Sequence, residues 1–158
     1  MQHCCIYYKR CIFVNLNSRI LMSIEELLKL KGVRSTGIRL KLIQVLMNSE
    51  YPLQQKEIEE RWDEHIDRVT LYRNLKFLTS IGIIHKIEVS EFITSYNVNN
   101  LDDAEESSEH LHFHCVDCDK VICMPQHTID EYKLPEGFMP ANKKLIIDGT
   151  CKWCNTNG

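Results

Sequence analysis

The chain has 158 residues, of which 44% are hydrophobic and 26% are charged, and its formal net charge is −3. These proportions are typical of a soluble globular protein of one domain or two small ones, and no apolar run approaches the roughly eighteen residues of a membrane-spanning helix. Residues 99–158 hold five basic and eleven acidic side chains, which makes this part a poor surface for nucleic acid.

The first 21 residues have no clean hydrophobic period and no helix caps, whereas Ser23 and Glu26 form a capping-box pattern directly after Met22. We interpret residues 1–21 as a mis-assigned translation start or as an extra arm. Two adjacent basic residues interrupt their apolar stretch, so the pattern does not predict a signal peptide. We therefore expect a cytoplasmic protein with reduced cysteines, and a disulfide framework built from the eight cysteines is the alternative.

Apolar residues then recur at spacings of three and four, which predicts four helices. The first ends near Gly32, the second follows the N-cap candidate Thr36, the third spans residues 54–64, and the fourth follows the N-cap candidate Asp67. The side chains expected to be buried are Ile24, Leu27, Leu28, Ile38, Leu42, Val45, Leu46, Ile58, Trp62, Leu71, Leu75 and Leu78. A β-rich hairpin over residues 83–98 follows, and this order is typical of a winged helix-turn-helix.

The fourth helix is the candidate DNA reader, because its buried leucines leave polar and basic side chains on the outer face. Arginine can pair with guanine and a tyrosine ring can pack on a thymine methyl group, whereas a hydroxyl at a helix N-terminus suits phosphate. The predicted DNA contacts are Arg34, Arg39, Thr70, Tyr72, Arg73 and Lys76, with Asn74 and Lys86 as further candidates. The alternative is a solvated helix face without a partner.

The predicted organisation is a DNA-binding domain over residues 22–98, an acidic hinge over 99–109 and a small metal-binding domain over 110–158. The last of these is expected to contain a short helix near residues 127–132 and a strand over 144–147. A reader helix of this kind normally works in a symmetric dimer on palindromic DNA, so we expect a homodimer.

Two matched cysteine pairs mark the C-terminal domain, Cys115-x-x-Cys118 and Cys151-x-x-Cys154. Each pair lets two thiolates turn onto one ion, and two pairs complete a tetrahedron of sulfur. We predict a closed structural zinc site that stabilises a domain too small to be stable on its core alone. The alternative is four buried thiols.

Three histidines at alternate positions precede the first cysteine pair. In an extended strand His110, His112 and His114 share one face, opposite to Cys115, which predicts a second site separate from the structural zinc. Cys123, at the end of a predicted return strand, could turn towards these histidines. The predicted regulatory site is therefore His110, His112 and Cys123, holding a second divalent ion, zinc or ferrous iron. Weaker candidates are His114, His127 and His85.

Three motifs together resemble the ferric uptake regulator (Fur) family of bacterial metal-dependent repressors. They are Gly32-Val33-Arg34-Ser35-Thr36-x-x-Arg39, then Val69-Thr70-Leu71-Tyr72-Arg73-Asn74-Leu75-x-x-Leu78-x-x-x-Gly82-Ile83, and the His110-x-His112-Phe113-x-Cys115-x-x-Cys118 motif with Cys151-x-x-Cys154. The resemblance covers about residues 23–154. It implies an α+β fold with an N-terminal winged helix and a C-terminal α/β dimerisation domain. It also implies a homodimer on operator DNA, contacted by Tyr72 and Arg73, with regulatory metal at the hinge.

The chain departs from the family pattern at four positions of the regulatory site. Pro52 stands where the family often has a histidine, Asn97 and Cys123 replace carboxylates, and Leu111 stands where some members have Asp. Thiolate and imidazole ligands favour zinc or iron over manganese, so we predict a zinc- or iron-responsive regulator with a poor response to manganese.

Other functions remain as alternatives at this point. A thiol-based redox or peroxide response could use Cys123 and the zinc thiolates on the same fold. A zinc-structured interaction module with little DNA binding is another possibility. An enzyme is not expected, because the H-x-E and P-C-x-x-C motifs of a zinc deaminase are missing and no nucleophile–base motif is present.

Overall fold

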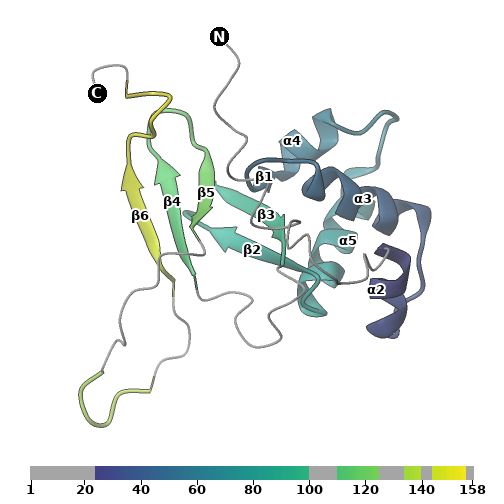
Figure 1. Cartoon of the computed structure of the whole chain (residues 1–158), viewed down its shortest axis with the longest axis horizontal. Coiled ribbons are helices and arrows are strands. Elements are labelled where there is room, and N and C mark those ends of the chain that lie inside the picture. Colours follow the sequence, from purple (N-terminus) through teal and green to yellow (C-terminus); the bar gives the residue numbers. More distant parts are fainter. Residues whose placement is uncertain (1–23, 100–109, 125–133, 140–143, 156–158) are drawn as a thin grey trace, which may run out of the picture.

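The computed structural model of the chain describes residues 24–99, 110–124, 134–139 and 144–155. The expected arm, the Ser23 cap, nearly all of the hinge and the helix predicted near residues 127–132 lie outside these ranges, as do Cys4, Cys5, Cys11 and His127. Within them, helices gather in the N-terminal part, and two small sheets lie next to each other beside them (Figure 1). No helix in the described ranges is long and apolar enough to cross a membrane.

The described helices are α2 (Ile24–Leu30), α3 (Gly37–Met47), α4 (Gln55–Glu60) and α5 (Arg68–Ser80). Thr36 and Asp67 cap α3 and α5 as predicted, because their side-chain oxygens accept hydrogen bonds from backbone N–H groups two or three residues into each helix. Gly82 follows α5 with a φ of 71°, the left-handed conformation that glycine adopts easily at a helix end. The inward leucines of α5, Leu71, Leu75 and Leu78, are fully buried as predicted.

Two helices differ from the sequence prediction. The third is shorter, because Gln54 acts as its N-cap, with its backbone N–H bound to the Glu57 carboxylate at 2.8 Å, and the helix ends at Glu60. Trp62 therefore lies beyond the helix and is only partly buried. On α3 the buried stripe is Leu42, Ile43 and Leu46, while Ile38 is 36% exposed and Val45 is partly buried. Leu42, Ile43 and Leu46 belong to the core of the helical part, where α2, α4 and strand β3 contact α3.

Each half of the described chain contains a three-stranded sheet. The first has the order β1 (Leu53–Gln54), β3 (Thr94–Val98), β2 (Ile84–Glu88), with antiparallel pairing throughout. The second has the order β5 (Val121–Met124), β4 (Leu111–Cys115), β6 (Ile146–Gly149). In it β4 is antiparallel to β5 and parallel to β6. The last strand lies two residues later than the predicted 144–147.

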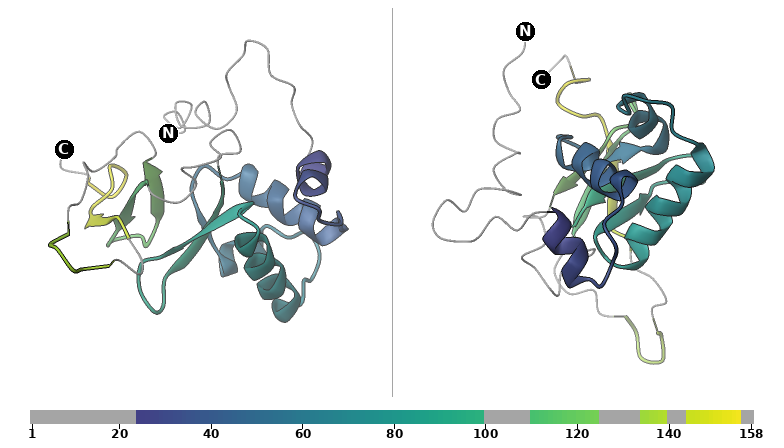
Figure 2. Two further views of the ribbon diagram at one scale, coloured as in Figure 1. Left: turned by 90° about the horizontal axis from the view of Figure 1, so that it is seen from below. Right: turned by 90° about the vertical axis from the view of Figure 1, so that its right-hand side faces the viewer.

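The wing strand β2 is part of the first sheet but contacts both halves, because successive side chains of a strand point to opposite faces. Ile84 joins the core of the helical part, whereas Ile87 packs with Val121 and Cys123 of the second sheet, supported by the partly buried Val89 and Ile146. An ion pair between Lys144 Nζ and Glu88 Oε2, at 3.2 Å, flanks this contact. The second sheet therefore lies directly against the wing (Figure 2).

Candidate metal centres and DNA-facing helix

The four paired cysteines come together at one end of the second sheet. The Sγ atoms of Cys115, Cys118, Cys151 and Cys154 all lie within 4.8 Å of one another. Cys115 ends strand β4 and Cys118 lies in the turn that follows, while the second pair lies in the turn after β6. The parallel pairing of β4 with β6 brings the two turns side by side, although they are far apart in the sequence.

The environment of this group favours thiolate at one position. Burial raises the pKa of Cys115, but backbone N–H groups, led by that of Cys151 at 3.3 Å, outweigh it and lower the pKa to about 6. The neighbouring sulfurs act in the other direction on Cys154, chiefly through the Cys151 thiol, and raise its pKa to about 12. A cation between the four sulfurs would balance their negative charge as thiolates, and their spacing fits a four-sulfur metal site.

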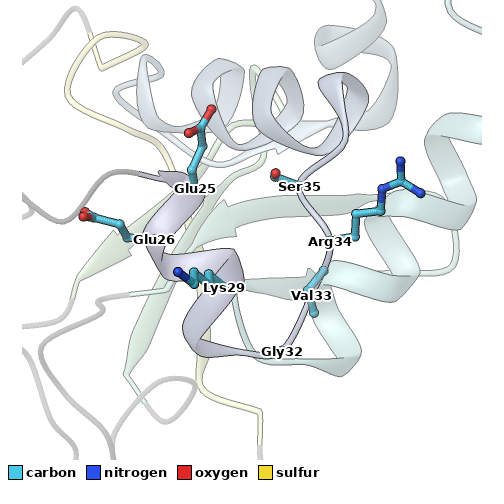
Figure 3. Close-up of a pocket in the computed structure, with 7 residues that line it drawn as sticks. All are labelled: Glu25, Glu26, Lys29, Gly32, Val33, Arg34 and Ser35. Carbon is cyan, nitrogen blue, oxygen red and sulfur yellow. The ribbon is translucent and has the colours of Figure 1, made fainter.

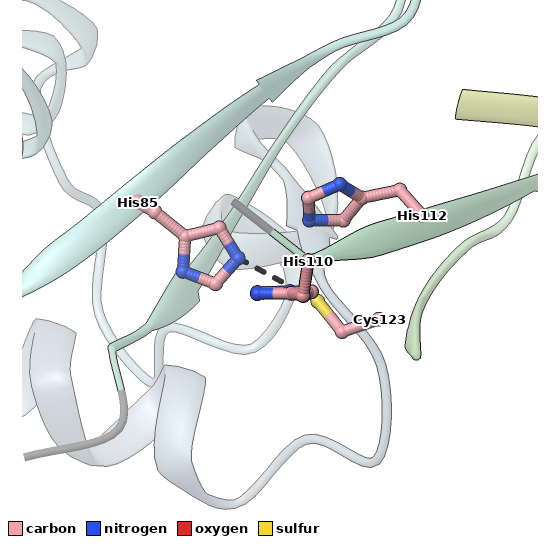
Figure 4. A group of neighbouring side chains, drawn as sticks. All are labelled: His85, His110, His112 and Cys123. Atoms are coloured by element: carbon pink, nitrogen blue, oxygen red, sulfur yellow. Dashed lines mark hydrogen bonds between the residues drawn. The ribbon is translucent and has the colours of Figure 1, made fainter. Parts of the chain in front are cut away.

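A second group combines residues from both sheets. One ligand atom each from His85, His110, His112 and Cys123 lies within 4.8 Å of the others, and His85 Nε2 is 3.5 Å from Cys123 Sγ (Figure 4). His112 and Cys123 are direct partners across β4 and β5, so their side chains share one face of the second sheet. His85 approaches that face from strand β2 of the first sheet. The ring centroids of His110 and His112 are 4.4 Å apart.

Burial prepares these side chains to bind a cation. It lowers the pKa of His85 to about 3, helped by repulsion from His110 and His112, and it lowers the pKa of His112 to about 4. The rings are therefore neutral at ordinary pH, with a lone pair free. The buried Nε2 atoms of His110 and His112 have no hydrogen-bond partner among the described residues. Three neutral imidazoles and one thiol match the ligand chemistry of zinc and related transition metals.

The outer face of α5 presents the predicted DNA-reading side chains. Tyr72 is 53% exposed, and Arg73 and Lys76 are exposed beside it. Thr70 is less available, because its backbone N–H and its hydroxyl both donate to the Asp67 carboxylate at 2.8 Å. The Asn74 amide donates to the Thr70 carbonyl at 2.8 Å.

Arg39 and Arg34, also predicted to contact DNA, lie at the entry to α3. The Arg39 guanidinium lies 4.3 Å from the centroid of the Phe77 ring of α5 and donates to the Arg34 carbonyl at 2.8 Å. Arg39 thus joins α3 to the reader helix, whereas the Arg34 side chain is exposed. Arg34 borders a shallow hollow with mixed charges, and its guanidinium points away from the hollow's two carboxylates (Figure 3). The lining residues are Glu25, Glu26, Lys29, Gly32, Val33, Arg34 and Ser35.

Comparison with known proteins decides the family. Residues 30–142 match the sequence model of the ferric uptake regulator family. The chain belongs to the ferric uptake regulator family. It is 25% identical to the peroxide operon regulator of Bacillus subtilis (strain 168), over 82% of this chain and 90% of that protein. The solved ferric uptake regulator of Vibrio cholerae is similar, with a TM-score of 0.58, 21% identity, and coverage of 80% of this chain and 98% of that one.

A zinc uptake regulator solved with zinc and DNA is also similar, with a TM-score of 0.58 and 20% identity, over 82% of this chain and 89% of that one. The predicted family and the α+β fold are confirmed. Members of the Fur family are metal-binding, DNA-binding transcription regulators rather than enzymes.

The structure brings together His110, His112 and Cys123 as predicted. It adds His85, which the sequence indicated only as a weaker candidate. One pattern pointed to it: His85 lies on the same strand face as Ile87, an imidazole on an otherwise apolar stripe. His114 lies apart from the group, because its Nδ1 is 2.8 Å from the Asp148 carboxylate.

Two of the four expected departures, Pro52 and Asn97, have different surroundings in the fold. Pro52 is buried next to β1 and offers no ligand atom. Asn97 lies beside the second group, and its amide contacts Cys123. Pro52 therefore supplies no ligand to the second group, whereas His85 of the wing lies within it.

Proposed function

We propose that this protein is a metal-responsive transcriptional repressor that binds a palindromic operator as a homodimer. A regulatory ion, held by His85, His110, His112 and Cys123, ties the wing to the second sheet. The ion would thereby fix how the winged helix of each chain, with its reader helix α5, is presented to DNA. The exposed face of α5 would contact bases and phosphates through Tyr72, Arg73 and Lys76. Arg34 would contact the DNA backbone.

One observation carries this proposal: the second group takes a ligand from each side of the contact between the two halves. His85 belongs to β2, which is part of the DNA-binding half, whereas the other three ligands belong to or directly precede strands of the second sheet. An ion bound by all four residues stabilises the docked arrangement over any arrangement in which β2 has moved away. Differential binding of this kind is what coupling between a metal and DNA requires.

The four-cysteine group has a different proposed role. Cys115, Cys118, Cys151 and Cys154 all come from the second sheet and its turns, so an ion there joins two parts of one domain. We assign it a tightly held structural zinc that keeps β4 and β6 together. It supplies no open coordination position and therefore does not report on metal supply.

DNA binding by a His85→Ala variant tests the proposal. A site would first be selected from a random duplex library with zinc-loaded protein, and affinities then measured by fluorescence anisotropy with and without the exchangeable ion. For the wild type we expect the ion to strengthen DNA binding on the order of 5–150-fold, the usual size of such coupling. For His85→Ala we expect a factor near one. His65→Ala is the matched control, since His65 is an exposed histidine of the same half and lies outside the metal-ligand groups.

Two results would point to the alternatives. Equal metal dependence in the wild type and His85→Ala would show that the ion does not act through the wing. No sequence-selective binding, and no effect of Arg73→Ala, would favour an interaction module. A redox response that begins at Cys123 has less support, because burial raises the pKa of Cys123 to about 12 and metal-free Cys123 is then an unreactive thiol.

A further inference from the structure

Asn97 contacts the second metal-ligand group but is not one of its ligands. Its side chain is an amide, whereas the ligands of the group are imidazoles and a thiol. It lies in β3 directly opposite His85 in the antiparallel pairing with β2. Its Nδ2 is 3.6 Å from Cys123 Sγ, and its Oδ1 accepts a hydrogen bond from the Val98 backbone N–H at 3.0 Å. The second contact sets the direction of the amide, so that its N–H group and not its oxygen faces the sulfur.

The ligand set itself has three nitrogens and one sulfur. Among the described residues, no carboxylate has an oxygen within the 4.8 Å span of this group. Zinc is commonly held by four nitrogen and sulfur ligands in a tetrahedral arrangement. Manganese prefers carboxylate, carbonyl and water oxygens, usually six of them. A donor N–H at the flank of the sulfur offers no lone pair, so this side of the site adds no further ligand.

We propose that Asn97 is a specificity-determining positioning residue of this site, which holds the Cys123 sulfur in a four-coordinate arrangement that accepts zinc-class ions and discriminates against manganese. The amide N–H stabilises negative charge on the sulfur, and hydrogen bonds of this kind from outside the ligand set orient a ligand and tune its affinity. The proposal rests on the proposed function only in that this group binds an exchangeable ion.

Asn97→Asp is the sharpest test, because it keeps the shape of the side chain and replaces the donor with an anionic oxygen. A carboxylate oxygen would then stand about where Nδ2 does now, 3.6 Å from Cys123 Sγ. We expect the ratio of manganese to zinc dissociation constants to fall at least tenfold. Metal affinities would be measured by competition with a chromophoric chelator, on full-length protein that keeps its tightly held zinc and has lost the exchangeable ion.

Cobalt(II) gives a second readout that a merely structural change would not alter. Bound to the wild type, it should show the intense visible bands of a four-coordinate ion together with sulfur-to-cobalt charge transfer. Asn97→Asp should weaken the visible bands as an oxygen joins the site. Asn97→Leu, which removes the N–H without adding a ligand, should weaken cobalt binding several-fold while leaving manganese binding as poor as in the wild type.

The outcomes separate this inference from the proposed function, because no DNA is present in the metal titrations. Manganese binding to the wild type within tenfold of zinc, or an unchanged ratio in Asn97→Asp, overturns the role of Asn97 even if DNA binding responds to metal. Suppose the ratio of manganese to zinc dissociation constants changes as expected, but DNA binding does not depend on metal. This result supports the role of Asn97 and counts against the proposed function. Failure of the wild type to bind any exchangeable ion overturns both.

Discussion

The two metal-ligand groups share strand β4 but differ in what they connect. Cys115 ends β4 and faces three cysteines from turns of the same small sheet, whereas His112, three residues earlier, faces His85 from the wing. An ion in the first group would hold one sheet together in any arrangement of the two halves. An ion in the second group would be bound fully only while the halves are docked. The proposed structural and regulatory sites thus differ in which elements supply the ligands.

Loss of a cysteine ligand should have the largest effect on the protein. Cys118→Ser, at an exposed position, is expected to release the structural zinc and to abolish cooperative folding of the second sheet. Structural zinc contributes about 10 kcal/mol or more in small domains, which is comparable to the entire stability of a typical domain. Metal analysis and thermal unfolding followed by circular dichroism would measure the result.

Cys123→Ser is the control for this change. It removes a buried thiol from the other group, so the protein should keep one tightly held zinc per chain and should still fold. If Cys118→Ser and Cys123→Ser both lost the tightly held zinc, the two groups would not be separate metal sites.

Acid should lower the folding stability of the protein through His85 of the second metal-ligand group. Burial, with repulsion from His110 and His112, lowers the folded-state pKa of His85 from 6.5 to about 3. As the pH falls below 6.5 the unfolded chain takes up a proton that the folded chain refuses, so folding stability falls. One such histidine costs up to about 1.4 kcal/mol per pH unit between these two pKa values.

Urea unfolding at pH 7.5, 6.5 and 5.5 measures this effect in protein that lacks the exchangeable ion but retains one zinc. His85→Gln should flatten the pH dependence relative to the wild type, and His65→Gln, at an exposed position of the same half, is the matched control. Part of the slope should remain in His85→Gln, because burial also lowers the pKa of His112 to about 4 and lowers that of His110. A slope as steep in His85→Gln as in the wild type would show that the burial of His85 at the contact does not matter for acid stability.

The sequence alone predicted the four-cysteine group in full, because paired spacing is a local property that survives any uncertainty about packing. It also placed α5, since a cap at Asp67 and three leucines at helical spacing specify both its start and its buried face. His85 could not be assigned with the same means. Its role depends on which face of β2 meets the second sheet, and this is decided by contacts such as Ile87 with Val121, between residues far apart in the chain.

The smallest expected effect concerns the ion pair between Lys144 and Glu88, which crosses the same contact. These side chains are 50% and 43% exposed, so solvent screens their attraction, and exposed pairs contribute about 0.2–1 kcal/mol. Lys144→Ala should therefore weaken binding of the exchangeable ion less than about fivefold, as measured by chelator competition. Lys56→Ala, which removes the exposed pair with Glu60 inside the helical half, should not change it.

The size of the Lys144→Ala effect decides what keeps β2 on the second sheet. If it stays small while His85→Ala abolishes metal coupling, the ion and the apolar contact around Ile87 hold the docked arrangement, and surface charge only adjusts it. If Lys144→Ala weakened metal binding as strongly as loss of a ligand, charge attraction would be the main link between the halves. Metal coupling would then fall steeply with ionic strength, because the pair is exposed to solvent.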